Sequence, residues 1–271
     1  MELVVLYVTA LNRRHLPVGG LGRADFRIYE DGVRQEIETF SHEDPPVTVG
    51  LVIDNSGSMR TKRTEVIAAA MAFARSSNPK DQLFLVNFNE HVTFGLPADR
   101  PFAGDLAQME MALSTIGALG KTALYDAVAA ALEHAKKGQT NKQALIVISD
   151  GADNASRYNA ARVVALAKHS EAIIYTIGIF EADDPDRDPG SLRQLAKATG
   201  GESFLPDSER QATAICEGIA RDIRSQYTIS YMPTNTKRDG KYRAIQVRAA
   251  APGGEHVYVR TRIGYYAPTK P

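Results

Sequence analysis

Residues 49–58 read VGLVIDNSGS, an apolar run that ends in a carboxylate and continues with two hydroxyls at alternate positions. Such a run is typical of a buried strand, and open α/β sheets bind ligands at the carboxyl ends of their strands. The side chains of Asp54, Ser56 and Ser58 can therefore turn their oxygens toward one point. Because oxygen ligands with few charges suit a hard divalent cation such as Mg²⁺, the stretch predicts a metal-binding loop.

Two later positions complete a longer pattern. Thr122 lies in GKTALYDAV, and Asp150 follows the apolar run ALIVIS. The pattern D-x-S-x-S, then a distant Thr, then a distant Asp, resembles the metal-ion-dependent adhesion site of the von Willebrand factor type A (VWA) family. The resemblance covers residues 47–224. It implies one bound Mg²⁺ or Mn²⁺, with direct ligands from Ser56, Ser58 and Thr122 and with largely water-mediated contacts from Asp54 and Asp150.

The predicted site also suggests a class of partner. A divalent cation that is held by hydroxyls and few charges stays electrophilic, and it can accept a carboxylate from an Asp or Glu of a protein partner as its last ligand. Asn55, Lys121 and Asp153 flank the predicted ligands and are the candidate partner-binding residues. The family usually has Gly where this chain has Lys121, and this cation either weakens metal binding or helps to hold an anionic partner.

Two other functions compete with a binding module. One is a metal-dependent hydrolase with Asp54 or Asp150 as nucleophile or base, and the other is a cytosolic partner of an ATPase complex. General acid-base catalysis needs a positioned group with a suitable pKa, and none of the six histidines lies in or next to the three predicted loops. GALGKT lacks the first glycine of a phosphate-binding loop, because Thr115 stands there. We therefore predict a binding protein rather than an enzyme.

The middle of the chain alternates between strand and helix patterns. Such alternation predicts a doubly wound, mostly parallel sheet with helices on both faces, a Rossmann-like α/β fold. The expected strands cover 49–54, 81–88, 91–96, 144–150, 172–180 and 202–206. The expected helices cover 61–76, 105–116, 123–137, 155–169, 191–199 and 209–225, and 181–190 is expected to be a surface loop.

Both ends of the chain show strand patterns without a helical period. Asp31-Gly32 between two alternating runs predicts a hairpin. Because neither end holds enough strands to be stable alone, we expect residues 1–46 and 226–271 to pair into one small β-sandwich-like domain, with the VWA domain at 47–225 inserted between them. DFRIYEDGVRQEIETF, YTISYMPT and RTRIGYYA resemble segments of the bacterial VWA-related proteins of the acidobacterial type. That resemblance implies a periplasmic or extracellular protein whose export signal has been removed.

The composition excludes some partners. The chain has 32 basic and 32 acidic residues, so no global field favours nucleic acid. No run approaches the roughly 20 apolar residues of a membrane span. Cys216 lies in a helical pattern and is predicted to be a core residue, whereas His91, His134 and His169 are predicted to be surface residues.

Overall fold

The computed structural model describes residues 3–114, 117–180, 187–251 and 256–269. The chain forms two compact units: unit 1 comprises Met1–Pro45 and Asp222–Pro271, and unit 2 comprises Pro46–Arg221. Two sequence predictions fall partly outside the described residues. They are the end of the helix expected at 105–116 and most of the loop expected at 181–190.

Unit 2 contains a six-stranded sheet in the order β10-β9-β8-β5-β6-β7. All its pairs are parallel except β6 with β7. The strands are β5 (Val47–Asp54), β6 (Gln82–Phe88), β7 (Val92–Phe94), β8 (Lys142–Ser149), β9 (Ile173–Gly178) and β10 (Ser203–Phe204). Every residue of β5 is buried, because helices cover both faces of the sheet. The predicted α/β fold is confirmed.

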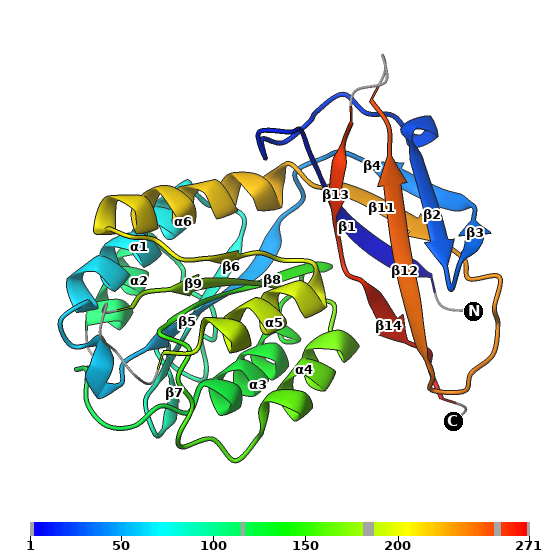
Figure 1. Ribbon diagram of the computed structural model, residues 1–271. Coiled ribbons are helices and arrows are strands. Elements are labelled where there is room, and N and C mark those ends of the chain that lie inside the picture. The colour runs from blue at the N-terminus through cyan, green and yellow to red at the C-terminus, as the bar shows by residue number, and fades with distance from the viewer. Residues whose placement is uncertain (1–2, 115–116, 181–186, 252–255, 270–271) are drawn as a thin grey trace. The chain divides into compact units, whose positions relative to one another are not determined.

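The helices form a layer on each face of this sheet (Figure 1). One layer contains α1 (Arg63–Ser76), α2 (Leu106–Ser114) and α6 (Glu209–Arg224), and the other contains α3 (Leu124–Ala135), α4 (Ala160–His169) and α5 (Pro189–Thr199). Small and branched side chains of α3, α4 and α5 pack on Val52, Val86 and Val147 of the sheet. Cys216 is fully buried in α6, as predicted, and burial raises the pKa of its thiol to about 12. Within the described residues, no helix is long and apolar enough to cross a membrane.

The starts of α4 and α5 differ from those that the sequence pattern predicted, and capping explains both differences. Helix α4 begins five residues late because the Asn159 side chain accepts a hydrogen bond from the Arg162 N–H at 2.9 Å. Helix α5 begins two residues early. Asp188 caps it, and a proline occupies the first turn, where a missing N–H has no cost.

The prediction that His134 is a surface residue is wrong. Its side chain is buried, and its ring lies against Phe84, with the centroids 4.6 Å apart, and against Phe94, at 4.5 Å. Burial lowers the pKa of His134, and its Nε2 lies 3.2 Å from the Pro101 carbonyl oxygen. The helical period places His134 near the buried face of α3, but only the tertiary structure shows that Phe84 of β6 and Phe94 of β7 cover its ring.

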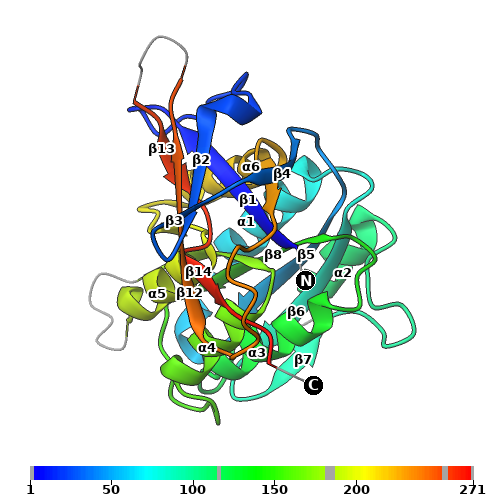
Figure 2. The ribbon, with the colours of Figure 1, turned by 90° about the vertical axis from the view of Figure 1, so that its right-hand side faces the viewer.

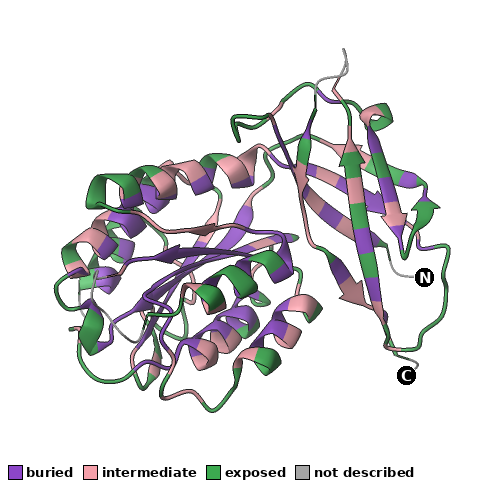
Figure 3. Cartoon of the chain, in the orientation of Figure 1, coloured by how far each residue is buried: buried purple, intermediate pink, exposed green. Residues whose placement is uncertain are grey.

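Unit 1 contains two antiparallel four-stranded sheets, in the orders β13-β1-β11-β4 and β14-β12-β2-β3 (Figure 2). Their strands are β1 (Val4–Leu11), β2 (Phe26–Glu30), β3 (Val33–Gln35), β4 (Ile37–Ser41), β11 (Tyr227–Tyr231), β12 (Tyr242–Ala249), β13 (Tyr258–Arg260) and β14 (Gly264–Tyr266). Strand β1 pairs with β11, and β2 pairs with β12, so strands from opposite ends of the chain lie side by side. Buried residues of both sheets form one apolar cluster. Strands β2 and β12 alternate between buried and more exposed positions (Figure 3).

A buried polar network lies inside unit 1. The Glu30 carboxylate accepts hydrogen bonds from Tyr231 at 2.7 Å and from Tyr265 at 2.9 Å, and lies 3.5 Å from an Arg243 nitrogen. Glu30 and Arg243 are both buried. Arg243 also donates to the carbonyl oxygens of Asn235 and Lys237. Burial and the Glu30 charge raise the pKa of Tyr265 to about 12, so both tyrosines stay protonated donors.

We expect Glu30→Ala to lower the free energy of unfolding by about 3 to 5 kcal/mol, because it leaves the Arg243 charge buried without its counter-charge. Tyr265→Phe removes a single hydrogen bond and should cost only about 1 kcal/mol. Urea unfolding monitored by tyrosine fluorescence measures both. If both variants lowered the free energy of unfolding by the same small amount, the two carbonyl oxygens alone would suffice to compensate the buried charge of Arg243.

Candidate metal site

Three loops meet at the carboxyl edge of the central sheet. Asp54 is the last residue of β5, and Asp150 follows the last residue of β8, the parallel neighbour of β5. Thr122 lies just before α3. The chain after Asp54 turns through the short 3₁₀ helix Gly57–Met59 into α1. The topology therefore places the three sequence-distant parts of the motif at one edge of the sheet, where open α/β sheets bind their ligands.

Hydrogen bonds join four of the five predicted residues. Asp54 accepts from the Ser56 N–H at 2.9 Å, and the Ser56 and Ser58 hydroxyl oxygens are 3.1 Å apart. Ser58 donates to Asp150 at 2.5 Å, a length typical of a hydroxyl on a carboxylate. The two carboxylates and two hydroxyls thus form a continuous cluster of oxygen atoms.

Thr122 is held to the loop that follows Asp150 through its backbone. Its N–H donates to the Asn154 side chain at 2.9 Å, and its carbonyl oxygen accepts from the N–H groups of Asn154 and Ala155. The preceding loop is tied to the first one, because the Gly57 N–H donates to the Gly120 carbonyl oxygen at 3.0 Å. Each loop is therefore bonded to another, and their relative positions are fixed.

The two buried carboxylates of the cluster would be stabilised by a bound cation. Asp54 and Asp150 are 2% and 0% exposed. Within the described residues, neither carboxylate pairs with a basic side chain. Burial, and next the Asp150 charge, raise the pKa of Asp54 to about 6. A divalent ion would supply the missing positive charge, and the carboxylate and hydroxyl oxygens match its ligand preference.

Access to the cluster comes through the first loop. Gly57 and Ser58 are exposed, whereas Ser56 and Thr122 are buried. A ligand from solvent would therefore approach beside Ser58. In the described part of the chain, no group of three or more His, Cys, Asp or Glu side chains could hold a metal ion. The cluster described above has only two carboxylates, and its other oxygen ligands would be hydroxyls, so it differs from a metal site built from His, Cys, Asp and Glu alone.

The three predicted partner-binding residues differ in how exposed they are and in how far their polar atoms already bond within the protein. Asn55 is buried, and its amide bonds with Asn87 at 2.9 Å and with Arg63 at 3.1 Å. The polar atoms of Asn55 therefore bond within the domain, which leaves fewer of them for a partner. Lys121 is exposed, and its N–H donates to Glu90 at 2.9 Å.

Asp153 has a mainly structural position. Its carboxylate accepts from the Tyr125 N–H at the start of α3 at 2.9 Å and from the Ser156 hydroxyl at 2.6 Å. A carboxylate at a helix N-terminus satisfies free N–H groups and favours the helix dipole. Asp153 therefore orients α3, which directly follows Thr122.

Two further residues support the cluster and were missed in the sequence. Ser149 donates to the second Asp54 oxygen at 2.6 Å and accepts from the Gly151 N–H at 3.0 Å. Asn154 holds Thr122, as described above. A polar residue at the end of an apolar strand was a possible signal for Ser149, but its partner depends on the pairing of β5 with β8.

Residues 49–152 match the family model described as von Willebrand factor type A domain, and all five predicted metal-site residues lie in this segment. The sequence of this segment is therefore similar to VWA domains, and the segment includes most of β5 and all of β6, β7 and β8 of the central sheet. No curated protein matches the chain.

Solved structures share the fold. A von Willebrand factor type A protein from Catenulispora acidiphila has 16% identity and a TM-score of 0.58, over 99% of this chain and 74% of that one. The vWF domain of the pilus tip protein Mfa5 from Porphyromonas gingivalis has 15% identity and a TM-score of 0.56, over 66% and 95% of the two chains.

A mussel byssus protein, proximal thread matrix protein 1 with a zinc-occupied metal-ion-dependent adhesion site, has 14% identity and a TM-score of 0.56. The match covers 72% of this chain and 50% of the mussel chain. At these identities the similarities establish the fold alone.

Proposed function

We propose that this protein is a metal-dependent protein-binding module. One Mg²⁺ or Mn²⁺ is held by Ser56, Ser58 and Thr122, with Asp54 and Asp150 in support. The bound metal supplies an electrophilic position that takes a carboxylate from an Asp or Glu of the partner. The observation that carries the proposal is the buried pair of carboxylates, which lies in a cluster of hydroxyls without a basic partner among the described residues.

The chain's own residues define how such a partner would be received. Ser58 lies on the exposed side of the cluster, and Lys121 is exposed on the loop that leads to Thr122. A cation at Lys121 favours an anionic partner by steering its approach. Asn55 and Asp153 are left out of the contact surface, because their polar atoms already serve the fold.

The comparisons support a binding role and a place outside the cytoplasm. Structures with this fold include a pilus tip protein and a pilus adhesin. We accordingly propose a periplasmic or extracellular location. The hydrolase alternative needs a group that transfers protons at the site. Among the described contacts of the five residues there is no histidine, lysine or cysteine.

A pair of matched peptides tests the proposal. We expect the full chain to bind fluorescent peptides with a single Asp or Glu in the presence of Mg²⁺, and to lose this binding in EDTA. Peptides with Asn or Gln at the same position should not bind, because a neutral amide is a poor ligand for a hard cation. Fluorescence anisotropy measures the affinities.

The matched control for this test is Glu110→Ala, which removes one exposed carboxylate from α2 and should leave binding unchanged. Lys121→Gln should weaken binding of the acidic peptide by a few fold, roughly the value of one exposed charge pair. Binding that persists in EDTA with equal affinity would reject the metal-mediated contact.

A further inference from the structure

One face of the β14-β12-β2-β3 sheet carries several arginine and tyrosine side chains. Arg27 and Tyr29 alternate with the buried residues of β2, and Arg248 and Gln246 alternate with those of β12. On β3, Arg34 lies directly opposite Tyr29. Arg27, Arg34, Gln246 and Arg248 are all exposed. We call these five residues the arginine face.

The arrangement of charge on this face is costly for folding. Arg27 and Arg248 are direct cross-strand partners, and like charges in directly opposite positions destabilise a sheet. Within the described residues, none of the three arginines pairs with a carboxylate. The nearby Asp31 carboxylate already accepts from the Ala244 N–H at 2.9 Å. The face therefore carries positive charge that the protein itself does not neutralise.

The guanidinium groups are partly held in place. Arg27 donates to the carbonyl oxygens of Ala24 and Phe26. Arg248 donates to Gln246 at 3.1 Å, and its guanidinium carbon lies 5.2 Å from the centroid of the Tyr29 ring. Planar guanidinium groups that are fixed in this way lose little entropy when they bind a carboxylate.

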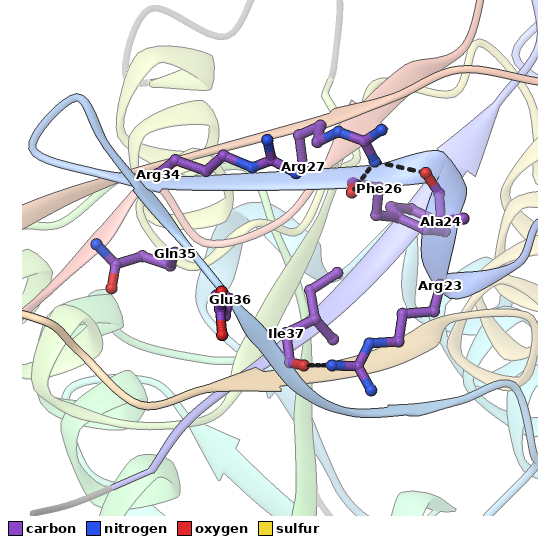
Figure 4. A pocket seen from close by; sticks show the side chains of 8 residues that line it. All are labelled: Arg23, Ala24, Phe26, Arg27, Arg34, Gln35, Glu36 and Ile37. Atoms are coloured by element: carbon purple, nitrogen blue, oxygen red, sulfur yellow. Dashed lines mark hydrogen bonds between the residues drawn. The ribbon is translucent and has the colours of Figure 1, made fainter.

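A concave pocket of about 740 Å³ lies beside the arginine face. Figure 4 shows Arg27 and Arg34 along one side of it and Arg23 on another, where Arg23 donates to the Ile37 carbonyl oxygen. Phe26 and Ile37 give the pocket an apolar part. Glu36 is its one acidic lining residue, against three arginines.

We propose that the arginine face and its pocket form a second, metal-independent binding site for an acidic protein segment. Carboxylates of the segment pair with Arg27, Arg34 and Arg248, and an apolar side chain enters the pocket. Guanidinium groups bind carboxylates through two parallel hydrogen bonds, so the charge of the face and the apolar pocket match an Asp- or Glu-rich peptide with an apolar anchor.

The geometry favours a peptide over other polyanions. Bases of single-stranded nucleic acids usually stack on free aromatic faces, but Arg248 already lies over the Tyr29 ring. Strand β3 is also at the edge of its sheet, and an extended segment can add to such an edge.

The test uses the full chain in EDTA, so that the proposed metal site takes no part. The probe is a fluorescent peptide of alternating Glu and Ala with one central Leu. We expect it to bind, and we expect the triple variant R27Q/R34Q/R248Q to bind it roughly tenfold more weakly. The matched control, R13Q/R14Q/K237Q, removes three exposed charges elsewhere in unit 1 and should change the affinity by less than about twofold.

Several results would overturn the inference. They are a lack of peptide binding in EDTA, an equal loss in both triple variants, and tighter binding of polygalacturonate or of an oligonucleotide than of the peptide. Thermal unfolding checks that the triple variant is folded. Because like charges in opposite positions destabilise the sheet, their removal should leave the melting temperature unchanged or raise it. The Asp54→Ala protein should bind this peptide as the unaltered chain does.

Discussion

Asp54→Ala should abolish detectable Mg²⁺ binding, with an affinity lower by about 10- to 100-fold or more. The Asp54 carboxylate orients the first loop by accepting from the Ser56 N–H, and it provides half of the buried negative charge at the site. Without it, a cation would meet a single carboxylate and would lose the fixed position of Ser56. Titration calorimetry measures the loss, with Mn²⁺ as a second ion.

Thermal unfolding provides an independent measurement of the same effect. A ligand at 100 times its dissociation constant stabilises the native state by about 2.7 kcal/mol, so saturating Mg²⁺ should raise the melting temperature of the unaltered chain but not that of Asp54→Ala. Glu110→Ala is the control. An unchanged Mg²⁺ affinity in Asp54→Ala would show that the metal binds elsewhere. Loss of the folded circular-dichroism signal in this variant would show that the fold itself depends on Asp54.

Removal of residues 1–44 should leave unit 1 unable to fold and the protein prone to aggregate. This segment supplies β1 to β4 and eight of the thirteen buried residues of the unit 1 apolar cluster, including Phe26 and Ile28. The remaining strands would expose Tyr227, Ile229 and Tyr231, and so few strands are marginal in water. Size-exclusion chromatography with light scattering measures the aggregation.

The inserted part provides the matched comparison. Residues 45–225 include the whole six-stranded sheet with its helices, and we expect this fragment to be monomeric and to unfold in one cooperative transition. Independent folding of the two parts stays a prediction. A soluble and equally stable protein after removal of residues 1–44 would contradict the pairing of the two ends into one folding unit.

Local patterns in the sequence determined the elements of unit 2 and the edge at which a ligand binds. The uninterrupted apolar run of β5 requires burial on both faces, and that requirement leads to a parallel sheet with two helical layers. Asp54 and Asp150 each follow such a run, so their meeting at the carboxyl edge follows from adjacent parallel strands. The metal-binding roles of the five residues remain predictions.

Only the tertiary structure revealed the features that depend on which distant segments of the chain pack together. Ser149 reaches Asp54 because β8 pairs with β5, and His134 is buried because aromatic side chains of β6 and β7 cover it. Glu30 is compensated by Arg243, more than two hundred residues away in the chain. The arginine face exists only in the register that sets Arg27 opposite Arg248. Strand register and side-chain burial are set by the sum of many long-range contacts, which no local pattern contains.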